Sequence, residues 1–519
     1  MLKNDIAALA PMPDDPILGL VSLYQADERP NKVNLGVGVY LNEAGKVPLL
    51  EVVEEAERRM TNRHQPRTYM PMSGLPAYCQ AVQKLVFGKD HPAVAAGTIA
   101  TVQTLGGTGA LQLGAAFAHQ FLGIQESVVS DPTWGNHIAI FKADGLSVGK
   151  YPYLSADRSA VDFDAMIKAL KALPPKTLVL LHGCCHNPTG LDLTHEEWRE
   201  VAQVVAEKDL LPLIDMAYQG FGDGIEEDAY AIRLFAELGL TFMAATSCSK
   251  NFGLYGERVG ALHIYCGTQE STAVVLSILK RIVRQEYSNP PCHGGQIVAE
   301  VLADPALEAA WRKEVDGMRA RIHAMRTALF EAGKAEGVDM SFAVKQKGMF
   351  SFTGLAPEEM DVLREEHAVY GVRNGRICIA GLNLRNVSVA AKAIADVIKS
   401  RQYSGEKHAS PQRTAGRSMA YIEALGDRGI FQSFFVPGEP SSQFCSSSSQ
   451  VVDEIRLQGE FEVVFGKLDF RPLCSGLRKC TNRIAALHGP AHQFRAAREF
   501  RENCGMRRFA SCRKHFGKL

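Results

Sequence analysis

The sequence has no net charge and no long apolar run. Its 57 Lys and Arg balance 57 Asp and Glu, so no overall field favours nucleic acid or a membrane surface as a partner. No stretch reaches the roughly 18 apolar residues that a membrane-spanning helix needs. Residues 1–20 contain acids and prolines and lack a basic region followed by an apolar stretch, unlike a secretory signal. These absences predict a cytoplasmic protein with no membrane partner.

The usual spacings of metal ligands are also missing. In a chain that is not secreted, the 12 cysteines are expected to be reduced thiols. Cys184 and Cys185 are adjacent, and we interpret them as small apolar fillers at a strand end. The C-terminal cysteines are too irregularly spaced for a zinc site: Cys474, Cys480, Cys504 and Cys512. We therefore expect no bound metal.

The chain has enough apolar material for a large core, since 46% of its 519 residues are hydrophobic, and its length predicts more than one domain. Five short apolar runs without polar alternation predict strands covered on both faces: residues 127–130, 177–181, 211–214, 241–245 and 260–265. Pro212 weakens the third strand unless it lies at the strand's start. Thr194 and Glu197 form a capping box that predicts a helix up to about Lys208. This alternation favours a doubly wound α/β domain.

A long helix is predicted for residues 305–333, with Asp304 as its cap. Apolar residues recur there at helical spacing: Val315, Met318, Ile322, Met325 and Leu329. A smaller α+β region should follow through residues 348–352 and 376–381, and a last helix should end near Ser400.

The composition changes after Ser400. Residues 401–519 contain 19 Lys and Arg against 11 Asp and Glu, a serine run and scattered cysteines. We interpret this segment as a basic, solvated and partly disordered extension. Two alternatives stay open: a nucleic-acid-binding appendage, although no recognition motif accompanies the charge, and an erroneous or read-through reading frame.

The most informative segment is residues 247–260, which places Lys250 just after an apolar run and Arg258 eight residues later. Strand ends of open parallel sheets are where ligands usually bind. A lysine there can condense with an aldehyde cofactor, and the planar fork of an arginine can bind a phosphate through two parallel hydrogen bonds. The alternative is a solvated surface lysine and an exposed ion pair.

Three further places suit a site for an anionic cofactor. Residues 106–111 form a glycine turn running into a helix, and backbone N–H groups at a helix start can bind phosphate. Asp215 closes an apolar run, where a buried carboxylate needs a cation such as a pyridinium. Arg376 precedes a run of buried character, where a guanidinium needs an anion such as a substrate carboxylate. The alternatives are an ordinary turn, a loop-capping Asp and a structural ion pair.

Several motifs resemble those of the class I aspartate and aromatic aminotransferases: Ser-Cys-Ser-Lys-Asn-Phe-Gly-Leu-Tyr-Gly-Glu-Arg at 247–258, Asp-Met-Ala-Tyr-Gln-Gly-Phe at 215–221 and His-Asn-Pro-Thr-Gly at 186–190. The resemblance runs from about Asp14 to Ser400. It implies pyridoxal 5'-phosphate (PLP) as cofactor and the PLP-dependent transferase fold type I, an α/β fold with a large, mostly parallel sheet domain. The large domain would span residues 45–315, the small α+β domain would combine 1–44 with 316–400, and 401–519 finds no match.

The resemblance also implies a role for each matching residue. Lys250 would bond to PLP and move the substrate proton, Asp215 would pair with the ring nitrogen, and His137 would lie behind Asp215. Tyr218 and Asn187 would contact the ring oxygen, and Trp134 would stack on the ring. The phosphate would be bound by Gly107, Thr108, Ser247, Ser249 and Arg258, and by Tyr69 from the second subunit of a homodimer.

The remaining implied roles concern the substrate. Arg376 would bind its α-carboxylate, together with Asn187 and Trp134, and Arg284 would bind a distal carboxylate across the dimer interface. Gly38 would border the substrate entrance. Without the resemblance, Trp134 and His137 are ordinary core residues, Asn187 is part of a turn and Arg284 is a surface charge.

Together these residues predict a ping-pong transamination between an aromatic or dicarboxylic L-amino acid and 2-oxoglutarate. Residues 69–72, 104–106 and 380–383 look more like the aromatic branch of the family, and residues 250–254 look more like the aspartate branch. We favour an aromatic transaminase that accepts dicarboxylates; the alternative is an aspartate transaminase with minor aromatic activity. A ligand sensor that keeps this fold and binds DNA through the basic extension is a third hypothesis, without a helix-turn-helix pattern to support it.

Overall fold

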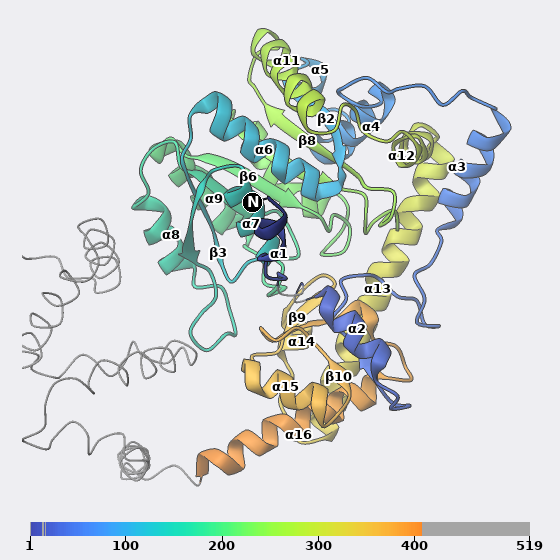
Figure 1. Cartoon of the computed structure of the whole chain (residues 1–519), viewed down its shortest axis with the longest axis vertical. Helices are drawn as coiled ribbons and strands as arrows, with labels where there is room; N and C mark the ends of the chain where they lie inside the picture. The colour runs from blue at the N-terminus through green and yellow to red at the C-terminus, as the bar shows by residue number, and fades with distance from the viewer. Residues whose placement is uncertain (1, 13–14, 16, 407–519) are drawn as a thin grey trace, which may run out of the picture. The chain divides into compact units, whose positions relative to one another are not determined.

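The computed structural model describes residues 2–12, 15 and 17–406, and its centre is a seven-stranded sheet (Figure 1). Across the sheet the strands are β2 (Ile99–Leu105), β8 (Val259–Tyr265), β7 (Phe242–Ser247), β6 (Leu211–Met216), β5 (Leu178–His182), β3 (Glu126–Asp131) and β4 (Ser147–Pro152). Only β8 runs against the others, antiparallel to both β2 and β7. The sheet is therefore mostly parallel.

All five predicted strands are confirmed, as β3, β5, β6, β7 and β8. Pro212 is the second residue of β6, close enough to the strand's start to be tolerated. The strands β2 and β4 were not among the predicted runs. Polar residues interrupt β2, and β4 is an edge strand whose residues are mostly exposed, so neither has the continuous apolar character of a strand buried on both faces.

Helices cover both faces of the sheet. One face carries α6 (Gly106–Leu122), α7 (Gly135–Ala143) and α11 (Gln269–Glu286). The other carries α3 (Glu51–Asn62), α4 (Pro76–Phe87), α5 (Pro92–Ala95), α8 (Phe163–Lys171), α9 (His195–Lys208), η1 (Glu227–Ala229), α10 (Tyr230–Glu237) and α12 (His293–Ala303). Along β7, Met243 packs into the first layer and Phe242 into the second, as the alternating side chains of a strand require.

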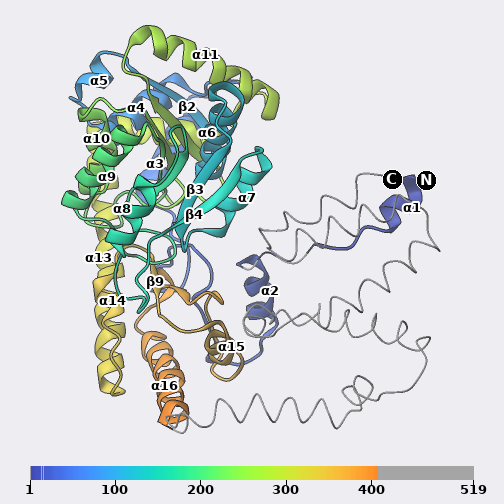
Figure 2. The same ribbon diagram turned by 90° about the vertical axis from the view of Figure 1, so that its left-hand side faces the viewer.

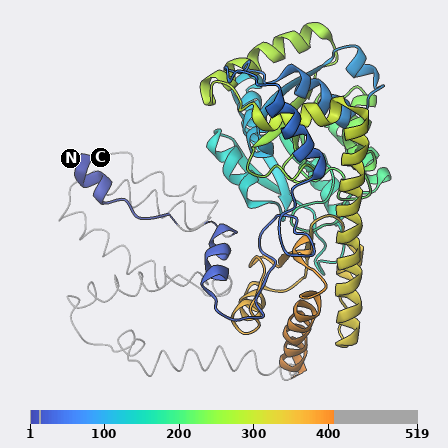
Figure 3. The same ribbon diagram turned by 90° about the vertical axis from the view of Figure 1, so that its right-hand side faces the viewer.

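Two helix starts follow the predicted caps. The Thr194 side chain accepts a hydrogen bond from the Glu197 N–H, and Glu197 reaches back to the Thr194 N–H, so the capping box of α9 is present. Asp304 Oδ1 accepts from the Ala306 N–H at 2.8 Å and begins α13 (Pro305–Ala335). The long helix α13 extends from the helices beside the sheet to the smaller region, as Figures 2 and 3 show.

The smaller region contains two short sheets. In one, β9 (Phe350–Phe352) pairs antiparallel with β11 (Arg376–Cys378); in the other, β1 (Val33–Asn34) pairs parallel with β10 (Val369–Tyr370). The pairing of β1 with β10 joins segments more than 300 residues apart in the chain. The helices outside the large sheet layers are α1 (Leu2–Ala7), α2 (Leu18–Ala26), α14 (Phe342–Lys345), α15 (Pro357–Glu365), η2 (Ile379–Gly381) and α16 (Val387–Glu406).

The last helix, α16, is longer than predicted, because it continues past Ser400 to Glu406. The predicted basic extension, 401–519, lies outside the described residues from 407 onward, as do Cys474, Cys480, Cys504 and Cys512. Within the described part of the chain, no helix combines the length and the apolar character needed to cross a membrane.

Candidate active site

Lys250 follows the end of β7 by three residues, in the loop at the carboxyl edge of the sheet. Its side chain is half-buried, and Nζ lies 4.8 Å from the centroid of the Tyr218 ring. Burial lowers the pKa of Lys250 from 10.5 to about 8; the Asp215 carboxylate opposes this shift, and the cations Arg258 and Arg376 add to it. About a tenth of the amine is therefore neutral and nucleophilic at pH 7, far more than for an exposed lysine.

Asp215 lies in the neighbouring strand β6, where its side chain is 11% exposed. Its Oδ2 is 3.0 Å from His137 Nε2. Burial tends to raise the pKa of Asp215, but the His137 hydrogen bond and the nearby positive charges outweigh it and leave the pKa below its ordinary value. The group is thus an ionised carboxylate that can pair with a cationic N–H.

His137 is fully buried and is held from two sides. Its Nδ1 lies 2.8 Å from Thr133 Oγ1, and the Trp134 ring meets it edge-on, with centroids 5.1 Å apart. Two contacts were missing from the sequence interpretation: Thr133 Oγ1 also lies 3.3 Å from His182 Nε2, and the His182 ring stands 5.1 Å from that of His137. The sequence offered one indication of a role for His182: it is the last residue of β5 and pairs in register with Asp215 of β6.

The candidate phosphate site lies where α6 begins immediately after β2. The Gly106 φ of +68° is one that glycine adopts readily, and a Cβ at Gly106 would lie 2.6 Å from Arg258 Nη2. Ser247 Oγ lies 3.1 Å from Ser249 Oγ, which in turn lies 3.4 Å from Arg258 Nη1. The other bonds of Arg258 go to backbone carbonyls, so this cation keeps its charge available for an anion.

Gly107 and Thr108 are the second and third residues of α6. Backbone N–H groups in a first helical turn have no acceptor within the helix, and they carry the positive end of the helix dipole. A Cβ at Gly107 would lie 3.3 Å from the Ser247 Cβ. The structure therefore brings this helix start, the serines after β7 and Arg258 together.

Arg376 is a buried cation, 3% exposed. Its Nη1 donates to Asn187 Oδ1 at 3.2 Å, and its Nη2 donates to the Gly36 carbonyl at 2.9 Å. Among the described residues, its buried Nε has no hydrogen-bond partner. The guanidinium carbon stands 4.2 Å from the centroid of the Phe350 ring. Burial lowers the pKa of Arg376. The contacts described here give this cation no carboxylate partner, so it is suited to binding the carboxylate of a ligand.

Tyr218 and Gly38 also meet Phe350. The Tyr218 ring packs edge-on against the Phe350 ring, with centroids 5.7 Å apart. Burial raises the pKa of Tyr218, so its phenol keeps its proton and can donate a hydrogen bond. A Cβ at Gly38 would lie 3.0 Å from Phe350 Cζ, so the absence of a side chain leaves room for this ring.

In the described part of the chain, Tyr69 and Arg284 form no hydrogen bond with these residues. Tyr69 is 92% exposed and lines a surface pocket with residues 289–292. Arg284 is exposed at the end of α11, where Nη1 lies 2.5 Å from Ser288 Oγ. Both side chains are therefore open to a partner outside the chain.

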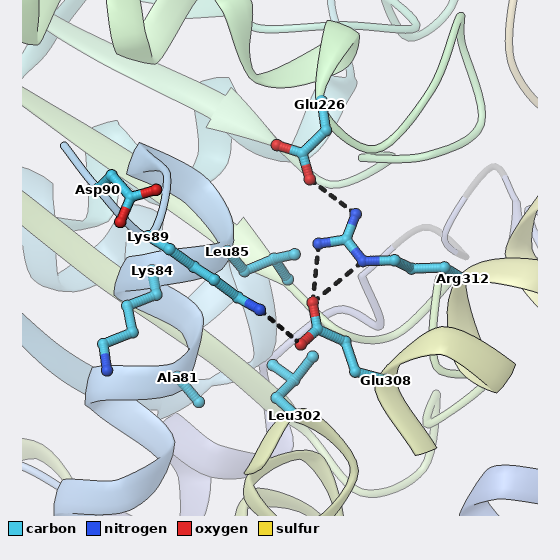
Figure 4. A pocket seen from close by; sticks show the side chains of 9 residues that line it. All are labelled: Ala81, Lys84, Leu85, Lys89, Asp90, Glu226, Leu302, Glu308 and Arg312. Carbon is cyan, nitrogen blue, oxygen red and sulfur yellow. Dashed lines mark hydrogen bonds and ion pairs between the residues drawn. The ribbon is translucent and has the colours of Figure 1, made fainter. Parts of the chain in front are cut away.

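Another pocket, shown in Figure 4, contains none of the candidate residues. Lys89 lies 3.1 Å from Glu308, which lies 2.9 Å from Arg312, which in turn lies 2.7 Å from Glu226. This chain of ion pairs joins the second residue after α4, the first turns of α13 and the residue before η1. We interpret it as structural.

The adjacent cysteines follow the end of β5. Cys184 and Cys185 are both buried in the core, and ligand-type atoms of these two and of Asp228 lie within 4.8 Å of one another. The Asp228 carboxylate, however, accepts three backbone N–H groups, from Gly220, Gly222 and Asp223. Its geometry is therefore that of a loop anchor.

Comparison with known proteins gives a consistent result. Residues 30–394 match the family model of aminotransferase class I and II. An aspartate aminotransferase of Pseudomonas aeruginosa is 48% identical over 76% of this chain and 99% of its own length. An aromatic-amino-acid aminotransferase of Escherichia coli is 48% identical over 74% of this chain and 98% of its own. The crystal structure of a Burkholderia pseudomallei aromatic-amino-acid aminotransferase covalently bound to pyridoxal phosphate is 52% identical, has a TM-score of 0.74, and covers 75% of this chain and 98% of that one.

Proposed function

Because this chain belongs to the class I and II aminotransferases, and is thus a PLP-dependent enzyme of fold type I, we propose that Lys250 is the residue that binds the cofactor and moves the substrate proton. The observation that carries this proposal is the half-buried amine with a lowered pKa, which lies 4.8 Å from the Tyr218 ring centroid and within the field of the Asp215 carboxylate. An amine that is partly neutral near pH 7 can act both as a nucleophile and as a base.

The surroundings of Lys250 fit the parts of PLP. We propose that Arg258, Ser247, Ser249 and the first turn of α6 bind its phosphate; the proposal is supported by the contact that a Cβ at Gly106 would make with Arg258. Asp215, kept ionised in part by His137, has the charge needed to face the ring N–H.

Three further side chains would contact the ring of PLP. We propose that Tyr218 and Asn187 bond to its ring oxygen and that Trp134 covers its face. The edge-on packing of Trp134 against His137, itself bonded to Asp215, supports a position over the ring.

When bound, PLP supplies an aldehyde that bonds to amines and a ring that accepts electrons from the substrate α-carbon. The chain would supply the remaining steps. The substrate amine would take the place of Lys250 on the aldehyde carbon, and the freed Nζ would then remove the proton from the α-carbon, while Asp215 would keep the proton on the ring nitrogen. Arg376 orients the substrate by binding its α-carboxylate through two parallel hydrogen bonds. An amino acid reacts first, and 2-oxoglutarate then restores the starting state.

We propose that the preferred amino acids are aromatic and that dicarboxylic ones are also accepted. Relatives named for aromatic and for aspartate transamination are equally similar to this chain, at 48% identity, which keeps aspartate transamination with minor aromatic activity as the alternative. Comparing kcat/KM for tyrosine, phenylalanine and aspartate tests the preference. If the aromatic values are negligible beside that of aspartate, the alternative holds.

We further propose a cytoplasmic homodimer in which Tyr69 and Arg284 complete the site of the other subunit. The 92% exposure of Tyr69 supports this, because a large aromatic ring so exposed is typical of an interface. Light scattering coupled to gel filtration measures the mass in solution; a monomer at micromolar concentration would contradict the proposal.

The domain division remains a proposal as well: residues 45–315 as the large domain, and 1–44 with 316–400 as the small one. It is supported by the parallel pairing of β1 with β10, which joins the two ends of the span.

The experiment that tests the central proposal is replacement of Lys250 by alanine. We expect the variant to bind PLP without transaminating in multiple turnovers unless an external amine is added. Multiple turnovers at the wild-type rate in the absence of amines would show that another residue moves the proton.

A further inference from the structure

The residue that would bind the substrate carboxylate lies in a sheet too small to be stable alone. The sheet contains only β9 and β11, three residues each, and it carries both Phe350 and Arg376. Isolated two-stranded sheets are marginal in water, and here the edge of β9 away from β11 is buried. Buried backbone groups on that edge need partners.

Arg326 of α13 provides some of these hydrogen-bond partners. The side chain is 2% exposed, and its Nη2 donates to the carbonyls of Gly348 and Phe350, both at 2.6 Å. Its Nη1 donates to the Ala343 carbonyl at 2.7 Å and to Ser351 Oγ at 2.8 Å. All four acceptors are neutral. Burial lowers the pKa of Arg326 to about 10, so the guanidinium is still charged at neutral pH.

Gln346 binds both backbone polar groups of Phe352, farther along the same edge of β9. Its side chain is 2% exposed, its Nε2 donates to the Phe352 carbonyl at 3.0 Å, and its Oε1 accepts from the Phe352 N–H at 2.8 Å. Arg326 and Gln346 thus occupy the place that a third strand would take. We call these two side chains the edge brace.

The edge brace contacts the strand that carries groups lining the site. Phe350 places its ring 4.2 Å from the Arg376 guanidinium carbon and 5.7 Å from the Tyr218 centroid. Phe352 pairs in register with Arg376 on β11. A displacement of β9 therefore moves the ring that packs against Arg376 and the strand that carries it.

We propose that Arg326, acting with Gln346, is a positioning residue for recognition of the substrate carboxylate. Burying a guanidinium without a counter-ion is unfavourable, and an apolar residue would pack in a helix more cheaply. Arginine offers a rigid fork that reaches four oxygens at once, which fixes β9 relative to α13. The inference rests on the proposed role of Arg376.

The test compares Arg326→Met and Arg326→Lys with the wild-type holoenzyme. Calorimetry measures the Kd of succinate, an unreactive dicarboxylate, and an absorbance titration measures the Kd of PLP. Because small misplacements of binding groups are costly, we expect the succinate Kd to rise roughly tenfold in Arg326→Met and less in Arg326→Lys, whose ammonium keeps the charge but not the fork. We expect PLP affinity to change less than twofold.

The matched control is Arg312→Met, on the same helix within the ion pairs of Figure 4. It should lower the melting temperature without changing the succinate Kd. A purely structural role for Arg326 predicts the same pattern for Arg326→Met, and a folded Arg326→Met protein with wild-type succinate affinity would overturn the inference.

Two more variants keep the test decisive. If Arg326→Met does not fold, Gln346→Met replaces it; we expect about a threefold rise in the succinate Kd, and an unchanged Kd would overturn the inference. Arg376→Met separates the two proposals. If it leaves succinate binding intact, the role proposed for Arg376 is wrong, whereas weakened binding in Arg376→Met alone refutes only the positioning role of Arg326.

Discussion

Replacing Lys250 by methionine should stabilise the cofactor-free protein at neutral pH. The folded state lowers the pKa of Lys250 from 10.5 to about 8, mainly through burial. At pH 7 the side chain is mostly protonated in the folded state and fully protonated in the unfolded state, so a shift of this size lowers the free energy of unfolding by about 3 kcal/mol. Methionine has a similar length and no charge, so it removes this penalty.

The pH dependence identifies the cause. Between pH 8 and pH 10.5 the unfolded chain holds more protons at Lys250 than the folded chain does, so the penalty decreases as the pH rises. We expect the advantage of Lys250→Met to shrink by about 2 kcal/mol between pH 7 and pH 9.5. Urea unfolding of both cofactor-free proteins, followed by tryptophan fluorescence at the two pH values, measures this difference.

Lys347→Met is the matched control. The ion pair with Asp223 outweighs burial and raises the pKa of Lys347 above 10.5, so its stabilising contribution is fully present below pH 10.5. The loss of stability in Lys347→Met should therefore be constant between pH 7 and pH 9.5. A Lys250→Met protein whose stability difference from wild type is equally constant would refute the reasoning about the buried amine.

Three further changes test the other parts of the site. Arg258→Met should weaken PLP binding by about 10- to 100-fold, because it removes charge-assisted hydrogen bonds; a titration of cofactor-free protein by absorbance measures this, and unchanged affinity would place the phosphate elsewhere. Arg284→Leu should lower kcat/KM for aspartate by at least about tenfold while changing that for tyrosine little, since only the dicarboxylate loses a partner; equal losses for both substrates would contradict the role. Asp215→Asn should reduce kcat by about 100-fold or more, because an amide does not hold the ring nitrogen protonated; a wild-type kcat would remove Asp215 from the mechanism.

The sequence predicted the large sheet well because its central strands are buried on both faces. Runs such as 241–245 have no polar interruption, and the structure buries every residue of β7. By contrast, β2 contains three buried polar residues. Thr101 bonds with His263, and the side chains of Gln103 and Thr104 donate to the carbonyls of Pro291 and Gly106. Such partners are invisible in the sequence, and the strand was therefore missed.

The motifs recovered the family, the cofactor and the enzyme class, which the comparisons confirmed. They did not reveal the groups that hold the site residues in place. The link from His137 through Thr133 to His182 depends on residues 133–137 meeting the end of β5. Arg326 stands in a helix rich in arginines, and only the structure distinguishes it, by its burial and its four neutral acceptors.

The most direct test of the account is the absorbance spectrum of the purified protein loaded with PLP, recorded before and after addition of tyrosine. We expect a cofactor band that disappears when tyrosine is added and returns when 2-oxoglutarate follows, because each substrate converts the cofactor in one half-reaction. A polypeptide that stays colourless and does not take up PLP, or a band that neither tyrosine nor aspartate changes, would contradict the central claim.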